Sequence, residues 1–197
     1  SAEALILYLG VVAAGGVYLP LNVGYTLAEL EYFIGDAEPR VVVCRPTSEK
    51  DLAPLAQKLG VAHVLTLGGN GDGSLMDKAK AVPTGFAAVP RTADDLTAIL
   101  YTSGTTGRSK GAMLTHHNLY SNAATLKDYW RFTSDDVLLH ALPIFHTHGL
   151  FVASNVILLA GASMIFLSKF DGDEVLKLLP RATSMMGVPT FYVRLLQ

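Results

Sequence analysis

The sequence predicts an α/β fold in which mostly parallel sheets are flanked by helices. Helix-like and strand-like segments alternate along the chain, and the strand-like segments are continuous apolar runs. Such runs are typical of strands that are covered on both faces, as in a parallel sheet between helices. The composition agrees, because 50% of the residues are hydrophobic and only 16% are charged, against roughly 25% charged in an average soluble domain.

The first half of the chain begins with a helix expected over residues 3–14, which Gly15 and Gly16 end. A short strand is expected over residues 17–21. Thr26 is followed three residues later by Glu29, a capping-box pattern that predicts a helix from Thr26 to Ala37. The further elements expected here are strands at 40–44 and 63–67, a helix at 51–59, a turn at 68–73 and a polar connection at 78–92.

The second half continues the alternation after a strand expected over residues 96–102, which leads directly into a polar loop at 103–111. The elements expected after that loop are helices at 118–130, 150–159 and 173–179, strands at 136–142, 163–167 and 184–188, and a last helix. Strands that alternate with helices in this way favour parallel sheets joined by helical crossovers.

Charge and cysteine content exclude several classes of protein. The net charge is −2, from 15 basic and 17 acidic residues without a basic cluster, so nucleic-acid binding is not expected. One cysteine and no N-glycosylation sequon favour a reducing, cytoplasmic location. The uncharged stretches at 4–28 and 137–168 are broken by glycine, proline and polar residues, so we expect buried helices and strands rather than membrane spans.

The low charge content also favours a fragment whose faces are buried against further chain. Ser1 leads directly into an apolar run, and the chain stops at Leu195-Leu196-Gln197 without a helix stop signal. Residues 1–197 are therefore expected to be an interior piece of a larger domain.

Residues 101–111 carry the strongest functional signal. The segment contains three glycines, five serine or threonine residues and two cations. Glycine lets successive backbone N–H groups converge on one anion, while hydroxyl groups and positive charge add further donors. The residues predicted to hold the phosphates of a nucleoside triphosphate are Thr102, Ser103, Gly104, Thr105, Thr106, Gly107 and Lys110.

This segment differs from the P-loop of other nucleotide-binding proteins. A P-loop that started at Gly104 would need glycine in place of Ser109 and serine or threonine in place of Gly111. The alternative to a phosphate-binding role is a polar loop that joins two strands.

Residues 101–111 resemble the phosphate-loop signature of the adenylate-forming superfamily, which includes acyl-CoA synthetases. Residues 14–22, 142–150 and 187–194 resemble three further elements of that superfamily, in the same order. Residues 125–151 are similar in particular to malonyl-CoA synthetases. The resemblance implies that residues 1–197 are part of the large N-terminal, AMP-binding domain, without the C-terminal lid domain.

The resemblance implies a ligase that takes ATP with Mg²⁺, coenzyme A and malonate as substrates. Lys110 and His146 would be catalytic, and His146, Thr147 and Arg194 would bind the substrate carboxylates. Another short- or medium-chain acid is the alternative substrate. Adenine, ribose and metal-binding elements have no counterpart in residues 1–197, so this piece alone is not expected to complete catalysis.

Two of these residues have simpler interpretations. His146 and His148 could be zinc ligands, but no third ligand is evident from the sequence. No metal site is therefore predicted. His146 could instead be a hydrogen-bonded histidine in a turn. Arg194 could pair with a second carboxylate, or it could be a solvated arginine on the last helix.

The competing function classes are a nucleoside-triphosphate hydrolase and a non-catalytic nucleotide-binding module.

Overall fold

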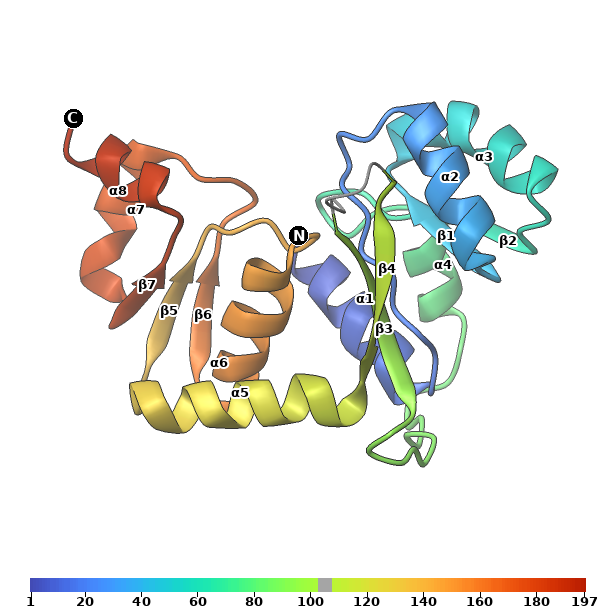
Figure 1. Cartoon of the computed structure of the whole chain (residues 1–197). Coiled ribbons are helices and arrows are strands. Elements are labelled where there is room, and N and C mark those ends of the chain that lie inside the picture. Colours follow the sequence, from blue (N-terminus) through green and yellow to red (C-terminus); the bar gives the residue numbers. More distant parts are fainter. Residues whose placement is uncertain (103–107) are drawn as a thin grey trace. The chain divides into compact units, whose positions relative to one another are not determined.

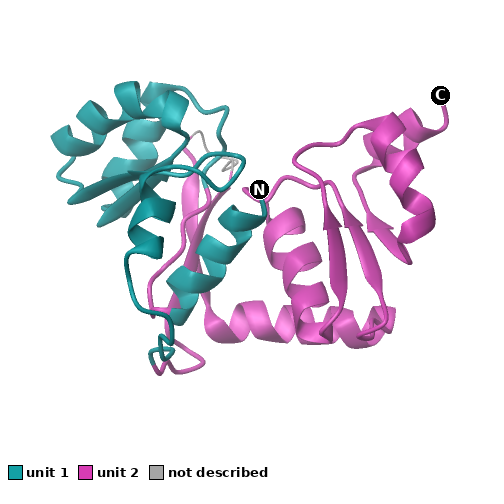
Figure 2. Cartoon of the chain, turned by 180° about the vertical axis from the view of Figure 1, so that it is seen from behind, with its two compact units in different colours: residues 1–13, 21–89 teal, residues 14–20, 90–197 magenta. Residues whose placement is uncertain are grey.

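The computed structural model describes residues 1–102 and 108–197. The chain divides into two compact units, shown in different colours in Figure 2. Unit 1 comprises Ser1–Ala13 and Leu21–Val89, and unit 2 comprises Ala14–Pro20 and Pro90–Gln197. The predicted phosphate-binding residues Ser103, Gly104, Thr105, Thr106 and Gly107 lie outside the described residues.

Unit 1 is built around a two-stranded parallel sheet with helices (Figure 1). Its elements are α1 (Ala2–Ala13), α2 (Leu27–Ala37), β1 (Val41–Cys44), the 3-10 helix η1 (Pro46–Ser48), α3 (Glu49–Lys58), β2 (His63–Thr66) and α4 (Ser74–Lys80). Strands β1 and β2 run parallel, with Val41 opposite His63. The core includes Phe33 and Ile34 of α2 and Ala56 of α3.

The capping box predicted at the start of α2 is confirmed. The backbone N–H of Glu29 donates to the hydroxyl of Thr26 at 3.3 Å, and the N–H of Thr26 donates to the Glu29 carboxylate at 2.7 Å. These two bonds satisfy donors that the first turn of a helix leaves without partners.

Unit 2 contains an antiparallel hairpin and a three-stranded parallel sheet (Figure 1). Its elements are β3 (Leu96–Thr102), β4 (Lys110–Thr115), α5 (His116–Trp130), β5 (Val137–His140), the π-helix η2 (His148–Ser154), α6 (Asn155–Ala160), β6 (Ser163–Phe166), α7 (Gly172–Leu178), the 3-10 helix η3 (Leu179–Arg181), β7 (Ser184–Met186) and α8 (Pro189–Leu195).

The α/β fold with mostly parallel sheets is confirmed, although some elements differ from the expected ones. The loop expected to extend to residue 111 ends earlier, because Lys110 and Gly111 begin β4, which pairs antiparallel with β3. The strand expected at residues 17–21 is reduced to one bridge between Tyr18 and Ala98. Among the described strands, the β1–β2, β5–β6 and β5–β7 pairs are parallel, and the β3–β4 pair is antiparallel.

The three-stranded sheet has the order β6-β5-β7 and a core on each face. Leu138 packs on one face with Ile157 of α6, and its neighbour Leu139 packs on the other face with Val175 of α7. Successive side chains of a strand point to opposite faces, so α6 and α7 cover opposite sides of the sheet. In the described part of the chain, no helix combines the length and the apolar character that crossing a membrane requires.

Candidate functional site

The β3–β4 hairpin places two predicted phosphate-binding residues opposite each other. Thr102, the last residue of β3, pairs in register with Lys110, the first residue of β4, and both side chains are exposed. Residues 103–109 connect these two strands. Strand pairing thus places the hydroxyl group of Thr102 at one end of this connection and the ammonium group of Lys110 at the other end.

The other predicted site residues follow the carboxyl ends of the parallel strands. These ends meet at one edge of the sheet, because β5 pairs in parallel with β6 and with β7. After β5 the chain passes through His146 and Thr147 and then forms α6, which covers one face of the sheet. After β7 the chain forms α8, and Leu195 of this helix packs on the opposite face. Neighbouring strands that lead to opposite faces mark the place where open α/β sheets bind ligands.

His146 has an exposed side chain and a defined ring orientation. Its Nδ1 atom accepts a hydrogen bond from the backbone N–H of His148 at 3.3 Å. A nitrogen that accepts carries no proton, so the neutral ring holds its proton on Nε2. Burial is the main cause that lowers the pKa of the neighbouring His148. His146 can therefore donate from Nε2 to a carboxylate oxygen.

Arg194 lies against an aromatic pair at the same edge of the sheet. Its guanidinium carbon is 5.0 Å from the centre of the Phe170 ring, and Phe170 stacks on Phe191 of α8 at 4.0 Å. A guanidinium group over an aromatic face gains cation–π attraction and is held in place by it. Arg194 is exposed in this chain. Phe170, which the sequence analysis did not single out, thus positions the predicted carboxylate-binding group.

Gly149 lies at the end of the turn that contains His146. A Cβ atom at Gly149 would lie 2.3 Å from the carbonyl oxygen of Pro143, and this backbone atom has little freedom to move away. His146 is tied into the same turn, because its N–H donates to Pro143 O at 3.3 Å and its carbonyl accepts from Leu150 N at 3.0 Å. Only glycine fits between these neighbours without displacing the turn.

The substitution Gly149→Ala is accordingly expected to destabilise the fold by about 1–3 kcal/mol, the usual cost of overpacking. Each kcal/mol lowers the Tm by roughly 2–4 °C in a chain of this size, which thermal unfolding followed by circular dichroism would detect. Gly10→Ala is the matched control, because a Cβ atom at this exposed position in α1 meets nothing within 4 Å. An unchanged Tm for Gly149→Ala would show that the turn can relax.

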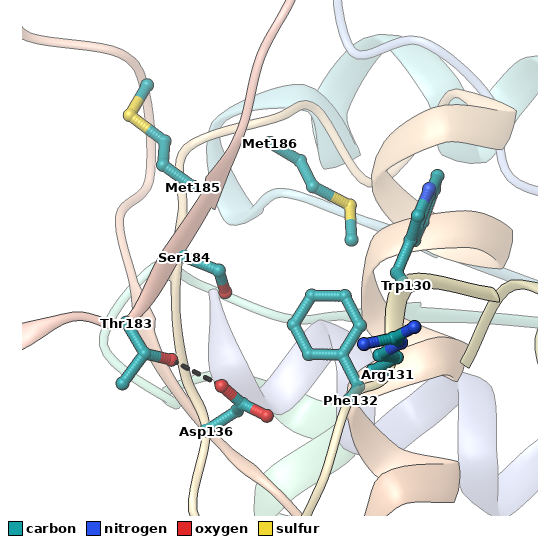
Figure 3. Close-up of a pocket in the computed structure, with 8 residues that line it drawn as sticks. All are labelled: Trp130, Arg131, Phe132, Asp136, Thr183, Ser184, Met185 and Met186. Carbon is teal, nitrogen blue, oxygen red and sulfur yellow. Dashed lines mark hydrogen bonds between the residues drawn. The ribbon is translucent and has the colours of Figure 1, made fainter. Parts of the chain in front are cut away.

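A pocket of about 340 Å³ lies elsewhere in unit 2 (Figure 3). It is lined by Trp130, Arg131, Phe132, Asp136, Thr183, Ser184, Met185 and Met186. Asp136 and Thr183 precede β5 and β7, so this pocket reaches the amino edge of the sheet. Hydrogen bonds from Thr133 N–H and then from the Thr183 hydroxyl hold the pKa of Asp136 below its usual value. None of the predicted site residues lines this pocket, and ligands of parallel sheets bind at the carboxyl edge instead.

Comparison with known proteins agrees with the fold and identifies the family. The AMP-binding enzyme family matches residues 1–197. The mitochondrial malonate–CoA ligase of Mus musculus is 36% identical over 93% of this chain and 32% of its own length. The malonate–CoA ligase of Arabidopsis thaliana is 33% identical over 100% of this chain and 34% of its own length.

A solved structure with high similarity is that of ATP-bound MatB from Rhodopseudomonas palustris. It is 67% identical to this chain, with a TM-score of 0.96, and the match covers 100% of this chain and 39% of MatB. The chain thus spans about a third of the length of the two malonate–CoA ligases and 39% of the length of MatB. A family model that covers every residue, together with these similarities, shows that the chain belongs to the AMP-binding enzyme family.

Proposed function

We propose that this chain forms part of an adenylate-forming acid–CoA ligase that makes malonyl-CoA from malonate, ATP and coenzyme A. The observation that carries the proposal is the pairing of Thr102 with Lys110 at the ends of the 103–109 connection. This arrangement suits a loop that surrounds phosphate groups, and the similarity to ATP-bound MatB supports it. The names of the two malonate–CoA ligases support malonate as the acid.

The proposed reaction has two steps. In the first step, a carboxylate oxygen attacks the α-phosphorus of ATP, the bond from this phosphorus to the bridging oxygen breaks, and pyrophosphate leaves. In the second step, the thiolate of coenzyme A attacks the acyl carbon, and the bond to AMP breaks. The ammonium group of Lys110 would stabilise the charge that develops on the departing pyrophosphate, and positioning and charge stabilisation are the main catalytic effects in phosphoryl chemistry.

Malonate differs from monocarboxylic acids by its second negative charge. In the proposed site, Arg194 pairs with the carboxylate that does not react, while Nε2–H of His146 and the hydroxyl of Thr147 donate near the reacting carboxylate. A planar guanidinium group can form two parallel hydrogen bonds to one carboxylate. A site of this kind selects a short dicarboxylate over an acid of equal length that lacks the second charge.

Magnesium would arrive with ATP. Among residues 1–102 and 108–197, no three His, Cys, Asp or Glu side chains cluster to hold a metal ion, so we assign no step to a metal site in this chain. We propose that residues 1–197 are an interior part of the large AMP-binding domain, since they span about a third of the named ligases. The cytoplasmic location stays a prediction, because the mouse relative is mitochondrial by name.

Carboxylate-dependent exchange of labelled pyrophosphate into ATP tests this function in the complete protein that carries the chain. We expect exchange with malonate and little exchange without an acid. A nucleoside-triphosphate hydrolase would release phosphate or pyrophosphate without exchange, and a non-catalytic module would do neither. Either of those results would contradict the proposal, and exchange with another acid but not with malonate would correct the substrate.

A further inference from the structure

A buried polar cluster lies directly beneath the turn that carries His146 and Thr147. His140, the last residue of β5, is 1% exposed, and Ser154, the last residue of η2, is 0% exposed. His140 Nε2 is 2.8 Å from the carbonyl oxygen of Gly149 and 3.1 Å from Ser154 Oγ. The Ser154 hydroxyl donates to the same carbonyl at 2.8 Å.

The acceptor chemistry fixes the protonation of His140. A carbonyl oxygen can only accept, so Nε2 must carry the proton that points to Gly149 O. Burial lowers the pKa of His140, which favours this neutral form. Nε2–H and the serine hydroxyl therefore both donate to Gly149 O, and buried donors that share one acceptor hold it strongly because no water competes for it.

Gly149 is consequently fixed from two sides. The carbonyl oxygen of Pro143 lies so close to Gly149 that an added Cβ atom would be 2.3 Å from it. His140 and Ser154 hold the carbonyl of Gly149. The residues between these contacts include His146 and Thr147. A π-helix begins at this point, a feature that is frequent at functional sites.

We propose that His140 and Ser154 are positioning residues that hold the His146–Thr147 segment in place for the carboxylate substrate. This inference rests on the proposed function and assigns a further role within the same site. His140 contacts no substrate; it acts through the carbonyl of Gly149. The sequence alone does not indicate this role, because His140 stands in an apolar strand and its partners come nine and fourteen residues later.

Three substitutions in the complete protein test the proposal. His140→Phe keeps a ring that can pack on Phe166, whose centre is 5.1 Å from that of His140, but removes the donor. His140→Gln places an amide N–H near the position of Nε2. Ser154→Ala removes the second donor. Thr97→Val is the control, because Thr97 is also buried and its hydroxyl has no hydrogen-bond partner among the described residues.

In pyrophosphate exchange, His140→Phe is expected to raise the KM for the carboxylate about tenfold, since small displacements of substrate-binding groups are costly. The KM for ATP should stay within about twofold, and His140→Gln should recover most of the loss. The double variant with His140→Phe and Ser154→Ala should have nearly the same KM for the carboxylate as His140→Phe alone, because both side chains hold the carbonyl oxygen of Gly149. Equal changes in both KM values, or no recovery with glutamine, would overturn the proposal.

Amide hydrogen exchange separates this inference from the proposed function. The Leu150 N–H bonded to His146 O should exchange about tenfold faster in His140→Phe than in the wild type or Thr97→Val, because the turn opens more often. If the wild type shows no pyrophosphate exchange, but Leu150 N–H still exchanges faster in His140→Phe, the proposed function is contradicted and the positioning role is not. An active wild type with unchanged Leu150 protection in His140→Phe would contradict the positioning role.

Discussion

Replacing Lys110 with alanine is expected to slow malonyl-adenylate formation about 10²-fold in the complete protein. Lys110 is exposed at the start of β4, opposite Thr102, so its side chain contributes little to packing. Loss of one charge contact to the departing pyrophosphate in a closed site costs about 3 kcal/mol, or about 10²-fold in rate. Malonate-dependent pyrophosphate exchange measures this effect, and circular dichroism should show an unchanged fold.

Lys177→Ala is the matched control for that variant. Lys177 is also exposed and lies on α7 in the same unit, so its removal changes the net charge equally without touching the hairpin. We expect wild-type exchange for Lys177→Ala. Exchange at the wild-type rate in Lys110→Ala would remove Lys110 from the proposed catalytic residues, whatever the acid substrate is.

The elements with local signals are those that the sequence predicts well. The start of α2 follows from Thr26 and Glu29 alone, because a capping box is formed by residues three apart and the structure contains both of its bonds. The strands β1 and β6 are short apolar runs that are followed by polar segments. The parallel pairing of β1 with β2 and of β6 with β5 follows from the helices between the paired strands.

The elements that were missed depend on tertiary contacts. Strand β4 begins with Lys110 and Gly111, which look like the end of a loop, and it becomes a strand only because β3 offers a partner. No helix was expected at α4 (Ser74–Lys80), which overlaps the start of the polar connection expected at residues 78–92. The backbone N–H of its Ser74 donates to the Thr66 hydroxyl of β2. Propensity is weak at such positions, and partners far along the chain decide the structure.

In the candidate site, too, features with a local sequence signal were predicted and features that depend on tertiary contacts were not. The residue types at 101–111 and the His146 and Arg194 positions were visible in the sequence, whereas the supports of these residues were not. Phe170 beneath Arg194 and His140 beneath Gly149 come from other segments. Ring stacking and buried hydrogen bonds between such segments leave no periodic pattern, so only the folded chain reveals them.

Replacing Arg194 with methionine is expected to change the preference for malonate over propionate by about 10²- to 10³-fold in the complete protein. Malonate would lose the partner of its second charge. If the complete protein shields this charge pair from water, removing one member of the pair costs roughly 3–5 kcal/mol. Propionate has no second charge, so its kcat/KM should change little. The stacking of Phe170 on Phe191 should survive, because methionine can also pack on an aromatic ring.

The measurement is kcat/KM for malonate and for propionate in the wild type, Arg194→Met, Arg194→Lys and Arg181→Met. Arg181→Met is the matched control, since Arg181 is exposed and precedes β7 at the opposite edge of the sheet. Arg194→Lys should fall between the wild type and Arg194→Met, because lysine keeps the charge but not the two parallel hydrogen bonds. If Arg194→Met lowers kcat/KM for both acids by the same factor, Arg194 only supports the Phe170–Phe191 stack. The preference for a dicarboxylate must then come from another cation.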